Sequence, residues 1–243
     1  MIKKIAALSI LVLLVQTAFA QDTPSTKRLS VSGNIQITNN GTAPVPIFAL
    51  GKPAVIGSTV IRKGHFYFNS ELYFGVDAKP WTINTRFGYY FIDNAKWSIS
   101  FATNPNLFFL RRDPNLNKNE EFQLQRYWAN EIDGEFRAGA NRKIQFNYWH
   151  TFSMDHLGVE REEWLNLVFV LENIRLGEKN IFTFKPSVFY IYDKNTIEGL
   201  FVAQTTNYQR IKWKWNLFLQ TTVQVHVVPP ESFIWNAGLN IPF

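Results

Sequence analysis

The chain has 243 residues, a formal net charge of +6 at pH 7 and no cysteine, so disulfide bonds cannot stabilise it. Its basic residues are scattered rather than clustered, which gives no support for nucleic-acid binding. Aromatic residues make up 16% of the chain, yet its mean hydropathy is slightly below neutral. Such a composition suits segments that separate apolar rings and polar side chains onto two faces.

The first twenty residues have the features of an export signal. Lys3 and Lys4 give a charged start, residues 5–15 are apolar, and Ala18 and Ala20 place small residues at a cleavage site. The apolar stretch is short for a membrane helix, although a retained N-terminal anchor is the alternative. No cysteine follows the cleavage site, which argues against a lipoprotein. We expect the mature chain to begin near Gln21.

Beyond this signal, apolar and polar residues alternate over long runs. In 65–76, for example, Phe66, Phe68 and Leu72 share one face, whereas Asn69 and Glu71 share the other. Many runs approach or exceed the roughly nine to eleven residues that a tilted strand needs to cross a bilayer, whereas soluble strands average about five or six. The alternation predicts strands at 29–38, 65–76, 81–91, 97–110, 127–138, 144–153, 163–174, 181–192, 199–206, 211–227 and 233–243.

The final run carries a family resemblance. Phe233, Trp235, Leu239, Ile241 and the terminal Phe243 occupy alternate positions, and this pattern resembles the assembly signal of bacterial outer-membrane β-barrels. The resemblance implies a transmembrane antiparallel β-barrel surrounded by outer-membrane lipid. It also implies recognition by the barrel assembly machinery through the C-terminal strand. A soluble secreted barrel, with its apolar phase turned inward, is the architectural alternative.

The connections predict the number of strands and their orientation. Short turns at 93–96, 140–143 and 177–180 alternate with longer connections at 111–121, 154–162 and 193–198. Short turns are periplasmic and long loops extracellular in such barrels, so we expect both termini in the periplasm and an even strand count. The alternation of apolar and polar residues alone predicts eleven strands. We therefore predict twelve, with the missing strand within 45–61 despite its prolines; ten is the alternative, in which 29–38 does not span.

The predicted organisation is thus a cleaved signal peptide at 1–20, a short periplasmic lead-in at 21–28 and a barrel over 29–243. Charged residues on the polar phase should face the lumen, because Lys or Arg facing lipid at the bilayer midplane costs about 2–4 kcal/mol. The predicted lumen-lining residues are Glu71, Arg86, Glu131, Asp133, Glu135, Arg137 and Lys185.

Two functions fit such an interior. One is a non-enzymatic narrow pore for small solutes, and the other is a structural or surface barrel closed by a network of ion pairs. The bulky inward residues Tyr67, Tyr73 and Tyr90 favour a narrow or closed lumen. Most of the eight tryptophans fall near predicted strand ends, where we expect an aromatic girdle at the lipid headgroups. A sugar-stacking platform is the alternative for them.

An enzymatic alternative rests on His150. Some outer-membrane lipid hydrolases carry a His-x-Ser pair on the outer face of the barrel, but here Phe152 occupies the serine position, and Ser153 falls on the opposite face. We therefore expect no catalytic site. The four histidines lie on different segments without ligand-type spacing, so we expect no metal, and no phosphate-binding glycine loop indicates a cofactor.

Overall fold

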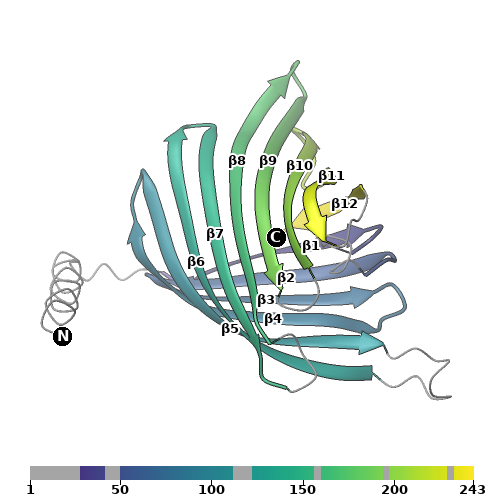
Figure 1. Ribbon diagram of the computed structural model, residues 1–243. Helices are drawn as coiled ribbons and strands as arrows, with labels where there is room; N and C mark the ends of the chain where they lie inside the picture. The colour runs from purple at the N-terminus through teal and green to yellow at the C-terminus, as the bar shows by residue number, and fades with distance from the viewer. Residues whose placement is uncertain (1–27, 42–49, 112–121, 156–159, 194–196, 229–232) are drawn as a thin grey trace, which may run out of the picture.

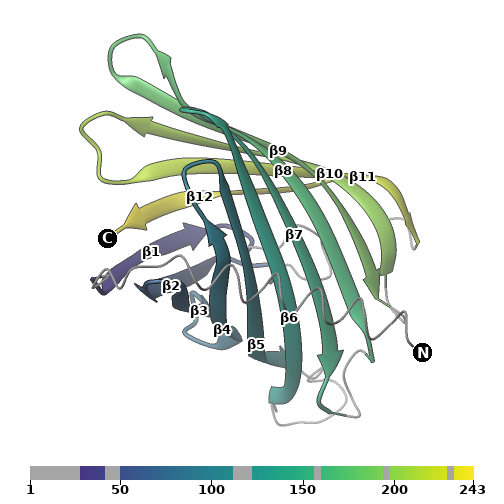
Figure 2. The ribbon, with the colours of Figure 1, turned by 90° about the vertical axis from the view of Figure 1, so that its left-hand side faces the viewer.

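A computed structural model describes residues 28–41, 50–111, 122–155, 160–193, 197–228 and 233–243. These residues form one closed barrel of twelve strands, each hydrogen-bonded to its neighbours in chain order. The strands curve around a single interior (Figures 1 and 2). They are β1 (Ser30–Thr38), β2 (Ala54–Lys63), β3 (Phe66–Gly75), β4 (Pro80–Asp93), β5 (Trp97–Arg111), β6 (Phe122–Gly139), β7 (Arg142–Ser153), β8 (Glu162–Leu176), β9 (Asn180–Asp193), β10 (Ile197–Arg210), β11 (Asn216–Val228) and β12 (Ile234–Pro242).

The prediction of a twelve-stranded antiparallel barrel is confirmed. The strand expected within 45–61 is β2, which begins after Pro53 and extends two residues beyond the expected segment. All of its residues can therefore donate to the ladder, because the prolines that spoil the local pattern precede it. The predicted signal at 1–20 and the lead-in up to residue 27 lie outside the described residues.

Three strand boundaries were predicted wrongly. Strand β10 ends at Arg210, four residues after the expected end at 206. Strand β6 begins at Phe122, five residues before the expected start, and its first part alternates exposed Leu124 with buried Gln125. Strand β11 begins at Asn216 rather than at 211. Trp213 instead donates its backbone N–H to Arg210 over 2.8 Å, so residues 211–215 form a turn even though their alternation continues the strand pattern.

The barrel closes where β1 pairs with β12. Gly33 and Phe243 exchange two backbone hydrogen bonds of 3.0 Å each. The Phe243 ring lies so close over Gly33 that a Cβ atom on this glycine would sit 2.3 Å from the ring. Because the first and last strands pair, the described strands leave no sheet edge open.

The apolar phase of the strands faces outward. Exposed apolar side chains occur on both sides of the seam and far from it, for example Val31 at 60%, Leu165 at 53% and Val225 at 59%. Polar residues such as Asn104, Glu131 and Asn236 are nearly fully buried on the inward phase. This is the reverse of what a soluble barrel requires, so that alternative is wrong for the described strands.

The two ends of the barrel differ in their connections. Short turns at 64–65, 94–96, 140–141, 177–179 and 211–215 lie at the end where β1 begins and β12 finishes; we call this the turn end. The opposite end, which we call the loop end, carries the longer connections, including 112–121 and 154–161. No helix among the described residues is long and apolar enough to span a membrane.

A substitution at Gly238 on β12 tests how closely β12 packs against β1 and β11. We expect Gly238→Ala to lower the free energy of unfolding by about 1–3 kcal/mol, because the new Cβ would lie 2.0 Å from the backbone oxygen of Ile37 and 2.6 Å from the Phe218 ring. Urea titration of the barrel in detergent micelles, followed by tryptophan fluorescence, measures this loss.

The matched control is Gly57→Ala on β2, where an added Cβ meets no atom within 4 Å. This variant should unfold at nearly the wild-type urea concentration. Equal losses in the two variants would show that the seam accommodates the extra methyl group, contrary to the geometry.

Candidate functional site

A cavity of about 1070 Å³ lies inside the barrel, against the walls formed by β2 to β9. Of the residues predicted to line the lumen, five do line this cavity: Arg86, Glu131, Asp133, Glu135 and Arg137. Glu71 is not among the lining residues but bonds directly to Arg86. Lys185 does not line the cavity either. It lies on β9 and interacts electrostatically with Glu172 and Lys143.

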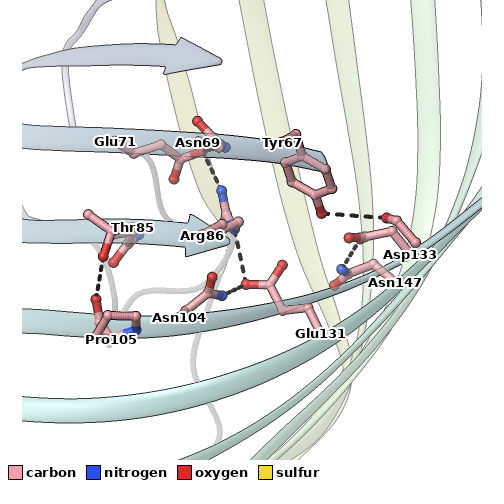
Figure 3. A network of polar contacts seen from close by, with 12 residues as sticks. Tyr67, Asn69, Glu71, Thr85, Arg86, Asn104, Pro105, Glu131, Asp133 and Asn147 are labelled. Carbon is pink, nitrogen blue, oxygen red and sulfur yellow. Dashed lines mark hydrogen bonds and ion pairs between the residues drawn. The ribbon is translucent and has the colours of Figure 1, made fainter. Parts of the chain in front are cut away.

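Arg86 is the centre of a buried polar network (Figure 3). Its Nη1 donates to Glu71 Oε1 over 2.7 Å, and its Nε donates to Glu131 Oε1 over 3.0 Å. The three side chains are 13%, 18% and 3% exposed. Asn104 also donates to Glu131, and the Tyr73 hydroxyl donates to Glu71 over 2.9 Å. Every side chain named here thus has a charged or polar partner within the network.

The strand register explains why these side chains meet. On β3, β4, β5 and β6 they all occupy the inward phase, and Ala102 on β5 is the direct partner of Glu131 on β6. On its other side Ala102 pairs with Gly88 on β4, and Arg86 reaches across β5 to Glu131. The network therefore links four adjacent strands along one wall of the cavity.

A second group of charges lies nearer the turn end. Arg137 Nε donates to Glu135 over 2.8 Å, and Gln145 donates to the other Glu135 oxygen over 2.8 Å. Asn147 donates to Asp133 (Figure 3). Arg62 pairs with Asp93, and its guanidinium lies 4.2 Å from the centre of the Tyr90 ring. These residues give the turn end of the cavity a wall of mixed charge.

The expected aromatic girdle is wrong for three tryptophans. Trp97 and Trp235 are 43% and 52% exposed on the outer face, but Trp81, Trp149 and Trp164 line the cavity. The inward position of Trp164 could have been found in the sequence, because it precedes the outward Leu165 and alternation assigns it to the opposite face. Trp81 could not, since the register of β3 and β4 shifts beside it, between Tyr73 and Phe74.

Trp164 begins a row of stacked rings on the inner wall of β8, β9 and β10. Its ring lies parallel to Phe189 with centroids 5.0 Å apart, and Phe189 stacks on Phe201 at the same distance. Phe189 and Phe201 are 2% and 0% exposed. This part of the interior is therefore filled by side chains, and the cavity lies to one side of it.

His150 lies outside the cavity, 36% exposed on the outer face. Its Nδ1 is 3.5 Å from Glu163, which also accepts the Tyr148 hydroxyl over 3.0 Å. Among the described residues, no serine or threonine hydroxyl bonds to the imidazole; the Ser153 hydroxyl donates to the Asp155 carbonyl instead. The described residues thus supply His150 with a carboxylate but with no nucleophile. They also contain no cluster of three or more His, Cys, Asp or Glu placed to hold a metal.

Comparisons with known proteins agree on the fold. The sequence matches no protein-family model and no curated protein. One similar solved structure is a KdgM porin in complex with disordered oligogalacturonate. The two sequences are 9% identical, the match covers 88% of this chain and 98% of the porin, and the TM-score is 0.53. A second is an outer-membrane channel from Pseudomonas putida F1, which is 11% identical to this chain. The match covers 91% of this chain and 98% of the channel, with a TM-score of 0.51. A third is a bacterial polysaccharide outer membrane secretin, which is 10% identical to this chain. The match covers 90% of this chain and 99% of the secretin, with a TM-score of 0.51. The chain therefore has the fold of bacterial outer-membrane β-barrels.

Removal of the Arg86 charge tests the network. We expect Arg86→Gln to lower the free energy of unfolding by about 3–5 kcal/mol, because Glu71 and Glu131 would remain buried without their cation. Adding Glu131→Gln to this variant should recover part of the loss, since one of the two uncompensated carboxylates is then neutral. Urea titration in micelles measures both effects.

Arg137→Gln serves as the control, because Arg137 is 31% exposed and bonds to Glu135 on its own strand. Its loss should be below about 1 kcal/mol. Similar losses for Arg86→Gln and Arg137→Gln would contradict a special role for the buried network.

Proposed function

We propose that this protein is a narrow channel of the bacterial outer membrane that passes small hydrophilic solutes. The observation that carries the proposal is a cavity of about 1070 Å³, lined by charged and amide side chains, inside a barrel with an apolar outer surface. A porin and an outer-membrane channel are among the proteins of similar fold, so the architecture is compatible with transport.

The outer surface supports placement in a membrane. Apolar side chains cover it, and the exposed Trp97 and Trp235 suit the boundary between hydrocarbon and headgroups. The export signal at 1–20 and recognition of the strand ending at Phe243 by the assembly machinery complete this proposal. The short turns lie at the end where β1 begins and β12 finishes, which favours a periplasmic turn end and an extracellular loop end.

The charge of the cavity favours cations. Each of the arginines lining it pairs with a lining carboxylate: Arg62 with Asp93, Arg86 with Glu131, and Arg137 with Glu135. The wall carries further carboxylates, among them Asp133 and Glu162. Negative side chains beside a confined aqueous path raise the local concentration of cations and repel anions.

A structural or surface barrel remains the second candidate function, and one observation favours it. The stacked rings of Trp164, Phe189 and Phe201 fill the interior beside β8 to β10. Together with the ion pairs of the opposite wall, they narrow any continuous path. Conductance separates the two candidates directly.

We expect the purified barrel to give discrete conductance steps in planar bilayers, with a reversal potential in a KCl gradient that indicates preference for K⁺. The double variant Asp133→Asn, Glu162→Gln should shift this potential toward that of a non-selective pore. Glu178→Gln in the turn between β8 and β9 is the control and should leave the potential unchanged.

Two results would contradict the proposal. A folded barrel that stays silent over a range of voltages would favour the structural candidate. Steps with a preference for Cl⁻ would show that the arginines, rather than the carboxylates, control the path.

Cysteine labelling tests the orientation, because the natural chain has no cysteine. A membrane-impermeant maleimide applied to intact cells should label Glu160→Cys at the loop end and not Glu178→Cys at the turn end. Both variants should react after the cells are lysed. Labelling of Glu178→Cys alone in intact cells would reverse the orientation.

A further inference from the structure

The loop end of the cavity is surrounded by aromatic side chains. Six of them line it from six consecutive strands, and we call this set the aromatic vestibule: Tyr73, Trp81, Phe108, Tyr127, Trp149 and Trp164. The turn end, in contrast, is lined mainly by the ion pairs described above. The loop end therefore has more rings and the turn end more ion pairs, although Tyr67 and Tyr90 also line the turn end and Glu162 also lines the loop end.

Polar groups are placed between these rings by the strand register. Gln125 is the direct partner of Phe108, and Asn106 is the direct partner of Tyr127. Thr151 and Glu162 form a third polar pair beside Trp149 and Trp164. The vestibule thus combines apolar ring surface with hydrogen-bond donors and acceptors, as small-molecule sites do.

Several buried polar atoms of this region have no partner among the described residues. They include the indole Nε1 of Trp149, a donor, and the Oδ1 atoms of Asn106 and Asn166, which are acceptors. A buried polar group without a partner costs about 1–3 kcal/mol. All three residues line the cavity, so a small rotation of their side chains would let a solute hydroxyl, which both donates and accepts, pair with these atoms.

The ring faces are not equally available. Trp164 stacks on Phe189 and lies 6.0 Å from Trp149, and the Arg86 guanidinium lies 5.4 Å from the Trp149 ring centre. Among the described residues, no other ring contacts Phe108. Phe108 therefore lines the cavity with no other ring of the described residues stacked on it.

We propose that the aromatic vestibule binds a neutral saccharide at the loop-end entrance of the cavity. A pyranose ring has an apolar C–H face that fits the face of Phe108, and its hydroxyls match Asn106, Gln125, Thr151 and the Trp149 N–H. This inference names the solute class of the proposed channel and rests on that proposal for its physiological meaning.

Other solute classes fit less well. Glu162 and its direct partner Asp193 on β9 oppose an anion, and the unpartnered polar atoms oppose a purely apolar solute. An organic cation could use the aromatic rings and Glu162, but the Arg86 guanidinium already occupies the cation position over the Trp149 ring. The volume of about 1070 Å³ is at the upper end of the roughly 300–1,000 Å³ of ligand pockets, so a disaccharide can be accommodated.

Isothermal titration calorimetry tests the proposal on the full barrel in a detergent without a sugar headgroup. Maltose is the neutral probe, and choline is the cationic probe of the rival class. We expect saturable binding of maltose and none of choline. Phe108→Leu should weaken maltose binding by about tenfold, and Trp149→Phe, which removes the N–H but keeps an aromatic ring, should weaken it as well.

Phe101→Leu is the matched control, because Phe101 lies on the same strand as Phe108 but is 38% exposed on the outer face. It should bind maltose like the wild type. The heat-dependent electrophoretic mobility of each variant confirms folding, and Trp149→Phe provides a second test if Phe108→Leu does not fold.

Binding of choline but not maltose would overturn the saccharide assignment. Equal affinities of Phe108→Leu and Phe101→Leu would overturn the assigned position. Because calorimetry needs no open path, a barrel that conducts ions but ignores maltose refutes only this inference. A barrel that binds maltose but never conducts refutes only the channel.

Discussion

The closure of the sheet is the constraint on which the rest of the structure depends. In hydrocarbon, an unpaired backbone N–H or C=O costs several kcal/mol, so a spanning sheet must pair its first strand with its last. Here β1 pairs with β12, and Gly33 exchanges backbone hydrogen bonds with Phe243. Once the sheet is closed, every strand has one face toward the outside and one toward the interior. The sorting of apolar and charged residues follows from this geometry.

The same sorting produces the candidate site. Charges excluded from the outer surface gather inside, where they must find partners in a confined volume. Arg86 on β4 bonds to Glu71 on the adjacent β3 and reaches across β5 to Glu131 on β6. Aromatic residues lie on both faces of the sheet: Trp97 is exposed on the outer face, whereas Trp149 lines the cavity. The proposed ion selectivity and the proposed solute recognition would thus use side chains of the same interior.

Much of this architecture could be predicted from the sequence, because a period of two directly encodes the two faces of a strand. The strand count followed from parity, even though the prolines before β2 hid its start. The inward position of Glu131 also followed from alternation. The position of Trp81 did not, because the shifted register beside Tyr73 changes the phase. The first residues of β6 and β11 were predicted wrongly, because a pattern of residues does not show where hydrogen-bonded pairing begins. The contact between Arg86 and Glu131 depends on three strands at once, which no local pattern contains.

The seam also has a consequence for the order of assembly. Thr38 and Asn236, which hydrogen-bond across it, are separated by 198 positions, so the closing contact has nearly the largest sequence separation in the chain. Contacts of this kind form late and slowly, because the entropy of the intervening chain must be overcome first. Until β12 arrives, β1 presents an edge that any other strand could occupy. Protection of that edge is therefore a requirement of biogenesis, imposed by the topology before any function begins.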